Sequence, residues 1–278
     1  GYTDVHDLLA DPAVDAVVIA TPHHLHTPVV EAAATAGKAI LLEKPMAPTL
    51  GECDLILAAV ERAGVPLFVG HTNQFAPTYR QAKAILDAGE VGDIVLGIST
   101  MSKYWFEPNR RDWHLDRATG GGMWLTAGIH CLDRLTWLVS SPVSSVFASL
   151  TTRMHEQAAD DVGLIQLLYA NGVAGSVVSV GYRQGAPKHL TELTCTNGML
   201  NIGYEQIEVG RNGRWEQIPV AQDGDWMHTA LVEEWRAFAA AARGECPPAV
   251  DGAYARHIME VAFAAEESAR TGTAIAIQ

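Results

Sequence analysis

The chain has 278 residues, 48% apolar and 18% charged, a globular composition that excludes a disordered or collagen-like protein. Its 19 Lys and Arg against 32 Asp and Glu give a net charge of −13, which argues against a nucleic-acid-binding surface. The four cysteines lie far apart without a C-x-x-C pair, and no apolar run is long enough to cross a bilayer. We therefore expect a soluble cytoplasmic protein that binds neither nucleic acid nor membranes.

The first part of the chain predicts strands and helices in alternation. Three short apolar runs are typical of strands buried on both faces of a parallel sheet, and helical stretches separate them. The spacing of Thr49 and Glu52 is that of a capping box, which predicts the start of the second helix. This order predicts a parallel α/β domain. The predicted elements are strands 15–21, 39–43 and 66–70 and helices 27–36 and 50–63.

After about Pro77 the pattern changes to alternating strands joined by short turns, with helices at intervals. Such strands are typical of an antiparallel sheet. The rest of the chain is therefore predicted to be an α+β domain with a mainly antiparallel open sheet. The predicted helices are 79–88, 126–139, 227–242 and 253–270, and the predicted strands are 94–101, 143–152, 162–169, 173–180, 190–196, 199–202 and 206–209.

Polar residues follow each of the three parallel strands, in the segments 21–26, 43–45 and 71–75. Ligands of an open parallel sheet bind beyond the carboxyl ends of its strands, so these segments are candidates for a binding site. A plainer interpretation is that residues 21–22 only begin a helix and that residues 43–44 form a solvated turn. Position alone does not separate the two interpretations.

Three histidines, His23, His24 and His26, lie close together after the first strand. Closely spaced histidines can bind zinc, but no carboxylate or cysteine stands at a supporting spacing here. We therefore expect no metal site.

A glycine run at 120–122 leads into a predicted helix that carries Thr126, His130 and Asp133. At helical spacing these three residues share one face. A hydroxyl and an imidazole at a glycine-bordered helix start are suited to acid–base chemistry. A single helix histidine is also often structural, and both interpretations stay open at this point.

Together these segments resemble the Gfo/Idh/MocA family of nicotinamide-dependent oxidoreductases, named for glucose–fructose oxidoreductase and inositol dehydrogenase. The order and spacing of the motifs agree with the family, and the resemblance covers essentially the whole chain. The matching segments are 20–26, 36–45 with Glu43-Lys44-Pro45, 68–79, 111–113 and 120–133.

The resemblance implies a chemical role for two residues. Lys44 matches the lysine that contacts the nicotinamide ribose and the substrate hydroxyl, where a cation stabilises developing alkoxide charge. His130 matches the general acid/base that accepts the hydroxyl proton as hydride moves to NAD or NADP. The family pattern also implies that the Lys44–Pro45 peptide bond is often cis.

The resemblance also implies a division of labour along the chain. Residues 1–76 are expected to form a truncated Rossmann-like cofactor-binding domain, and residues 77–278 a domain for substrate binding and oligomerisation. A homodimer or homotetramer is expected. The expected cofactor contacts are Thr21, Pro22, His26, Glu43, Lys44, Asn73 and Trp113, and the expected substrate contacts are Lys44, Tyr79, Thr126 and His130.

Three features depart from the family pattern. Thr126 stands where many relatives carry Asp, and Gln74 where Arg often precedes the phenylalanine; both indicate a different substrate subgroup. No G-x-G-x-x-G occurs, although that turn holds the cofactor pyrophosphate in such folds. At ~30 residues per βαβ unit, roughly 50–60 residues are expected to be missing, and truncation is favoured over evolved loss.

The function that follows is hydride transfer between NAD(P) and a secondary hydroxyl or ketone of a sugar, polyol or cyclic diol. One alternative is cleavage of a glycoside through transient oxidation by bound nicotinamide. Another is a cofactor-free, non-catalytic member of the family. The retained Lys44 and His130 favour an enzyme, whereas Thr126 and the absent glycine motif favour the non-catalytic alternative.

Overall fold

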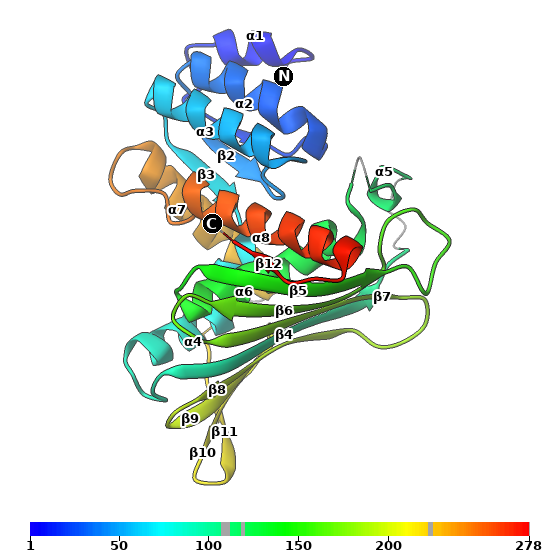
Figure 1. Cartoon of the computed structure of the whole chain (residues 1–278). Helices are drawn as coiled ribbons and strands as arrows, with labels where there is room; N and C mark the ends of the chain where they lie inside the picture. Colours follow the sequence, from blue (N-terminus) through cyan, green and yellow to red (C-terminus); the bar gives the residue numbers. More distant parts are fainter. Residues whose placement is uncertain (107–111, 118–119, 222–224, 278) are drawn as a thin grey trace. The chain divides into compact units, whose positions relative to one another are not determined.

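The computed structural model describes residues 1–106, 112–117, 120–221 and 225–277. The chain forms two compact units. The first contains Gly1–His71 and Val232–Met259, and the second contains Thr72–Leu231 and Glu260–Gln278. A parallel sheet lies in the first unit and a mostly antiparallel sheet in the second (Figure 1), which confirms the predicted fold class.

The first unit is built on a three-stranded parallel sheet in the order β1-β2-β3. Val18 of β1 is in register with Leu41 of β2, and Leu41 with Phe68 of β3. Helices α2 and α3 pack side by side (Figure 1). The elements are α1 (Val5–Ala10), β1 (Ala16–Ile19), η1 (His23–Leu25), α2 (His26–Thr35), β2 (Ala39–Glu43), α3 (Leu50–Ala63) and β3 (Leu67–Gly70).

The strands of this sheet differ in burial. Residues 39–42 of β2 and all of β3 are buried, as predicted for strands covered on both faces. The same prediction is wrong for β1, where Val18 is 40% exposed. The reason is its place in the sheet, because β1 is an edge strand that pairs with β2 alone among the described strands.

Helix α3 has the bounds that the capping box predicts. The Thr49 hydroxyl oxygen accepts a hydrogen bond from the Glu52 N–H at 3.2 Å, and the hydroxyl donates to the Glu52 carboxylate at 2.8 Å. The helix ends at Gly64, whose φ of +67° is the left-handed conformation that favours glycine.

Two later helices, α7 (Trp226–Ala242) and α8 (Gly252–Thr271), contribute residues to both units. Within the first unit, the Phe238 ring meets the Phe68 ring edge-on with centroids 6.1 Å apart. The Val69 N–H donates to the Val250 oxygen at 3.0 Å. The segment between α7 and α8 is therefore hydrogen-bonded to the main chain of β3.

The second unit contains a nine-stranded sheet in the order β11-β10-β9-β8-β4-β7-β6-β5-β12. Strand β4 pairs in parallel with β7 and antiparallel with β8. The elements of the second unit are η2 (Thr72–Phe75), α4 (Pro77–Asp87), β4 (Ile94–Tyr104), α5 (Asp112–Leu115), η3 (Trp124–Gly128), α6 (Ile129–Val139), β5 (Val143–Thr151), β6 (Val162–Tyr169), β7 (Ala174–Tyr182), β8 (Lys188–Cys195), β9 (Gly198–Ile202), β10 (Ile207–Arg211), β11 (Arg214–Ile218) and β12 (Ile275–Ala276).

Helix α6 packs on β4 and β7 and buries the core of this unit. A Cβ built on Gly97 of β4 would lie 2.6 Å from Leu135 Cδ1, so the helix approaches the strand where it carries no side chain. Arg134 is fully buried there, and its guanidinium donates to Ser99 Oγ and the Thr100 oxygen, each at 2.9 Å. Among the described helices, none is both long and apolar enough to cross a bilayer.

We predict that Thr49→Ala lowers the free energy of unfolding by ~1 kcal/mol, because it leaves the Glu52 N–H without its capping acceptor. Thr49→Ser keeps the hydroxyl and should retain most of the stability. Urea unfolding of both variants measures the effect. An equal loss in the serine variant would show that the hydroxyl does not act as a cap.

Candidate functional site

In the first unit, His26 connects the segments that follow β1 and β2. Its Nε2 lies 2.9 Å from the Thr21 oxygen and its Nδ1 lies 3.2 Å from the Met46 oxygen. The side chain is fully buried at the start of α2, and this burial lowers its pKa. His26 therefore contacts the main chains of both segments and, when neutral, donates its single N–H to one of the two oxygens. Its predicted contact with a cofactor stays a prediction.

Thr21 and Pro22 form the turn between β1 and η1 and are both half-buried. Among the described residues, the buried Thr21 Oγ1 has no hydrogen-bond partner. A buried hydroxyl without a partner is costly unless a ligand or water satisfies it. This atom is therefore suited to a polar ligand at the carboxyl end of β1.

Glu43 and Lys44 stand at the carboxyl end of β2, and both are half-buried. The Lys44–Pro45 peptide bond is cis, as the resemblance implied. Glu43 is in register with Gly70 of β3, where an added Cβ would lie 3.4 Å from the Glu43 carboxyl carbon. The absence of a side chain at position 70 leaves room for this carboxylate.

In the second unit, Asn73 and Tyr79 have partners inside the protein. Tyr79 is fully buried, and its hydroxyl lies 3.0 Å from Thr191 Oγ1 and 3.3 Å from the Ile202 oxygen. Asn73 is 3% exposed, and its side chain is a polar neighbour of the Tyr204 hydroxyl. These contacts give both residues a structural task, and their ligand contacts stay predictions.

Thr126 and His130 lie on consecutive elements, η3 and α6, and both are half-buried. The predicted α-helix over 126–139 needs a correction, because residues 124–128 form a π-helical turn. The Trp124 ring packs directly against Gly128 in this turn. A Cβ added at Gly128 would lie only 2.5 Å from the ring, so a larger residue there would collide with it. Single π-helical turns are frequent at functional sites.

The glycines at 120–122 allow the main chain to pass close to neighbouring residues just before this turn. Gly121 and Gly122 have φ values of +71° and +69°, which few other residues adopt. A Cβ on Gly122 would lie 2.8 Å from Asp160 Oδ1 and 2.7 Å from the Ala159 Cβ. The Thr126 hydroxyl donates to the Gly120 oxygen at 3.3 Å, which ties the run to η3.

Gln74, one of the departures from the family pattern, is buried and donates to Asp133 Oδ1 at 2.6 Å. This bond connects η2 to α6, the helix that carries His130. Asp133 is also fully buried, so the carboxylate expected beside Thr126 and His130 is engaged by the amide of Gln74.

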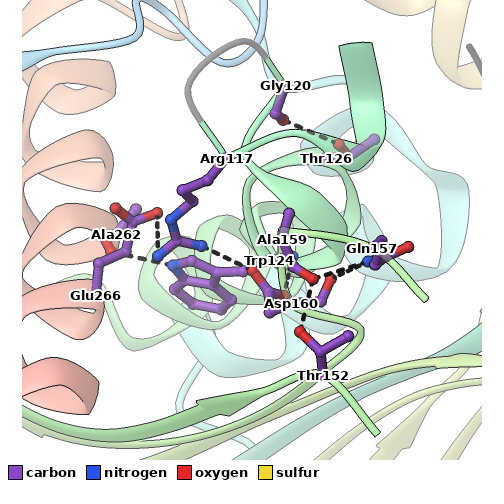
Figure 2. Close-up of polar contacts among 10 residues, drawn as sticks. All are labelled: Arg117, Gly120, Trp124, Thr126, Thr152, Gln157, Ala159, Asp160, Ala262 and Glu266. Atoms are coloured by element: carbon purple, nitrogen blue, oxygen red, sulfur yellow. Dashed lines mark hydrogen bonds and ion pairs between the residues drawn. The ribbon is translucent and has the colours of Figure 1, made fainter. Parts of the chain in front are cut away.

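Three charged residues beside η3 belong to none of the sequence motifs described above (Figure 2). Arg117 forms ion pairs with Asp160 at 2.9 Å and with Glu266 at 3.0 Å. Asp160 Oδ2 accepts a hydrogen bond from the Trp124 N–H at 2.8 Å. Burial raises the pKa of Asp160 to about 6 and that of Glu266 to about 7, although Arg117 opposes both shifts.

The only signal for this cluster in the sequence is the pair Asp160-Asp161 directly before an apolar strand. Asp161 accepts from the main-chain N–H groups of residues 153–155 and lies 3.1 Å from the His155 ring. Adjacent carboxylates with separate sets of partners show that this loop is built around buried charge.

The described structure thus places the predicted residues in two sets. The first unit holds Thr21, Pro22, His26, Glu43 and Lys44, and the second holds Asn73, Tyr79, Thr126 and His130. The side chain of Trp113 lies outside the described residues. No group of three or more His, Cys, Asp or Glu in the described part of the chain is arranged to hold a metal ion.

Two family models match the chain. The model of the oxidoreductase family with an NAD-binding Rossmann fold matches residues 1–71. The model of the GFO/IDH/MocA C-terminal domain matches residues 79–201. The two matches follow each other in the order of the two predicted domains.

Known proteins match over different lengths. Inositol 2-dehydrogenase 1 of Saccharopolyspora erythraea is 32% identical over 100% of this chain and 81% of its own length. The 1-carboxy-3-chloro-3,4-dihydroxycyclo hexa-1,5-diene dehydrogenase of Comamonas testosteroni is 32% identical over 65% of this chain, and the match spans 46% of that protein.

A solved structure is also similar. Levoglucosan dehydrogenase in complex with NADH and levoglucosan has a TM-score of 0.89 and 25% identity, covering 99% of this chain and 84% of that protein.

The burial of His26 predicts a pH dependence of stability. Because its pKa is lowered in the folded protein, the unfolded chain binds the proton more readily below pH about 6.5. The free energy of unfolding should therefore decrease as the pH falls below that value. His26→Gln should reduce this decrease, as measured by urea unfolding between pH 5 and pH 8.

His189 serves as the comparison, because burial lowers its pKa as well, to about 4. His189→Gln should therefore also reduce the decrease while leaving the contribution of His26 in place, and the two reductions should add in the double variant. An unchanged pH dependence in His26→Gln would contradict the assignment to His26.

Proposed function

Since the chain belongs to the Gfo/Idh/MocA family of oxidoreductases, we propose that it transfers hydride between NAD or NADP and a secondary hydroxyl or ketone. The substrate class is a sugar, a polyol or a cyclic diol. The names of the relatives support this class, because inositol, levoglucosan and the dihydroxycyclohexadiene each carry at least one secondary hydroxyl on a ring.

The observation that carries the proposal is the place of Lys44. It stands at the carboxyl end of β2, next to Pro45, where the ligands of a parallel sheet bind. The buried, unsatisfied Thr21 hydroxyl at the end of the neighbouring strand supports a polar ligand at the same edge. The residues present therefore fit a nicotinamide cofactor, with Thr21, Pro22, Glu43 and Lys44 as its proposed contacts.

The proposed chemistry needs one base and one cation. A bound nicotinamide supplies the hydride acceptor or donor. His130 takes the hydroxyl proton when the substrate is oxidised and returns it when the ketone is reduced. The Lys44 ammonium stabilises the alkoxide charge that develops on the oxygen. Thr126 adds a hydroxyl but no charge, so the base role falls to His130.

The remaining assignments belong to the same proposal. Residues 1–76 would bind the cofactor and residues 77–278 the substrate, with His26, Asn73, Trp113 and Tyr79 completing the contacts. The assembled protein would be a homodimer or homotetramer in the cytoplasm.

We predict that His130→Ala lowers kcat by about 10²–10⁴, since it removes the acid/base, while NADH binding is retained. Lys44→Ala should lower kcat and also weaken substrate binding. The exposed histidine His6 offers a matched control, because His6→Ala should leave kcat unchanged. Absorbance of NADH during turnover of sugars and polyols measures each effect.

The same assay separates the alternatives. Release of an alcohol from a glycoside without net NADH would replace the proposal with cleavage by transient oxidation. Full activity in both His130→Ala and Lys44→Ala would show that these residues do not carry the chemistry.

A further inference from the structure

A closed ring of polar contacts joins α8 to the first residue of η3 (Figure 2). The Trp124 indole N–H donates to the Ala262 oxygen at 3.0 Å, and its main-chain N–H donates to Asp160. Asp160 pairs with Arg117, and Arg117 pairs with Glu266. Ala262 and Glu266 are four residues apart on α8, so they lie on one face of the helix and close the ring.

We propose that Asp160 is a positioning residue for the catalytic segment, and that Arg117 and Glu266 hold its carboxylate in place. The carboxylate fixes the first turn of η3, which carries Thr126 and leads directly to His130. The inference rests on the proposed function, because it gives those two residues their chemical roles.

The main chain provides the first argument. The N–H groups at the start of a helix have no partners within it and need an acceptor. Met123 donates its N–H to the main-chain oxygen of Asp160 at 3.0 Å, and Trp124 donates to the carboxylate at 2.8 Å. Two consecutive N–H groups therefore end on one residue, and the negative charge also suits a helix N-terminus.

Packing provides the second argument. An added Cβ on Gly122 would lie within 3 Å of both Asp160 Oδ1 and the Asp160 nitrogen. The segments around residues 122 and 160 therefore touch without any intervening side chain. The Asp160 side chain itself is only 4% exposed. Asparagine at position 160 would keep one acceptor oxygen but lose the charge that pairs with Arg117, and an apolar side chain would leave the Trp124 N–H without its acceptor.

The consequence for catalysis follows from distance along the chain. Thr126 is two residues and His130 six residues after Trp124, so a shift of the first turn moves both. A misplacement of about 1 Å in an active site can cost about 10² in rate. The ring of contacts therefore controls the rate without touching the substrate.

The protonation state of Asp160 should change the hydrogen bonds of this ring of contacts, and that change can be measured. A cavity of about 260 Å³ lies beside it and is lined by Arg117, Thr151, Thr152, Asp160, Glu266 and Arg270, which opens the carboxylates to proton exchange. Arg117 favours the ionised form of Asp160, and Glu266 and Arg270 of α8 line the same cavity. A protonated Asp160 has one oxygen fewer to accept from Arg117 and Trp124.

The first test uses protein labelled with ¹⁵N-tryptophan, which has seven tryptophans and therefore few signals. Trp124→Phe identifies the main-chain signal of residue 124. We expect the chemical shift of this signal to change with pH on the acid side of neutrality. Asp160→Asn should abolish the change in chemical shift that the titration of Asp160 causes. Arg117→Met should move the transition to higher pH, because it removes the cation that favours the ionised carboxylate. Glu266→Gln should leave the Asp160 transition near its native pH, because the pKa of Glu266 is raised to about 7 and this group is largely protonated when Asp160 titrates.

Glu267→Gln is the matched control. Glu267 is the neighbour of Glu266 on α8, but it is exposed and 3.9 Å from Arg270, so the signal of residue 124 should titrate as in the native protein. No titration of the signal of residue 124, or no shift of its transition in Arg117→Met, would overturn the proposal.

The second test measures kinetics. Asp160→Asn should lower kcat/KM by about 10², because the shift of η3 displaces both the base His130 and the proposed substrate contact Thr126. Native kcat/KM in Asp160→Asn, with activity lost in His130→Ala, would overturn the positioning role and leave the proposed function standing. Native activity in His130→Ala would instead overturn the proposed function, whatever the signal of residue 124 shows.

Discussion

Main-chain groups at the ends of strands and helices need hydrogen-bond partners once they are buried. In each unit one ionisable side chain meets this need beside a candidate site segment. His26 joins the Thr21 and Met46 oxygens, which flank the segments after β1 and β2, and Asp160 accepts from the first residue of η3. Met46 lies two residues after Lys44 and Trp124 six residues before His130, so such a buried support lies close in the chain to each proposed catalytic residue.

The sequence predicted the local features of the fold because they depend on local interactions. The bounds of β2, α3 and β6 agree with the predicted ranges, since a capping residue, a glycine or a strict alternation marks their ends. Strand β11 was missed because four of its five residues are exposed and carry no apolar alternation. The burial of β1 was overestimated because a strand's place in a sheet is not a local property.

The candidate site was only partly predictable for the same reason. The motifs around Lys44 and His130 are continuous in the sequence, whereas Arg117 and Asp160 are 43 residues apart and meet only in the fold. The π-helical turn of η3 depends on the packing of Trp124 against Gly128 and on Ala262, which lies 138 residues further along the chain. The partner of Gln74 is likewise not predictable from the sequence, because Gln74 hydrogen-bonds to Asp133, which is distant in the chain.

The central claim is that this chain binds a nicotinamide cofactor, and a titration with NADH and NADPH tests it most directly. Energy transfer from the protein's tryptophans to the reduced nicotinamide reports binding, and circular dichroism confirms that the chain is folded. The account predicts saturable binding of at least one of the two cofactors, weakened in Lys44→Ala and retained in His130→Ala. A folded chain that binds neither cofactor would contradict it.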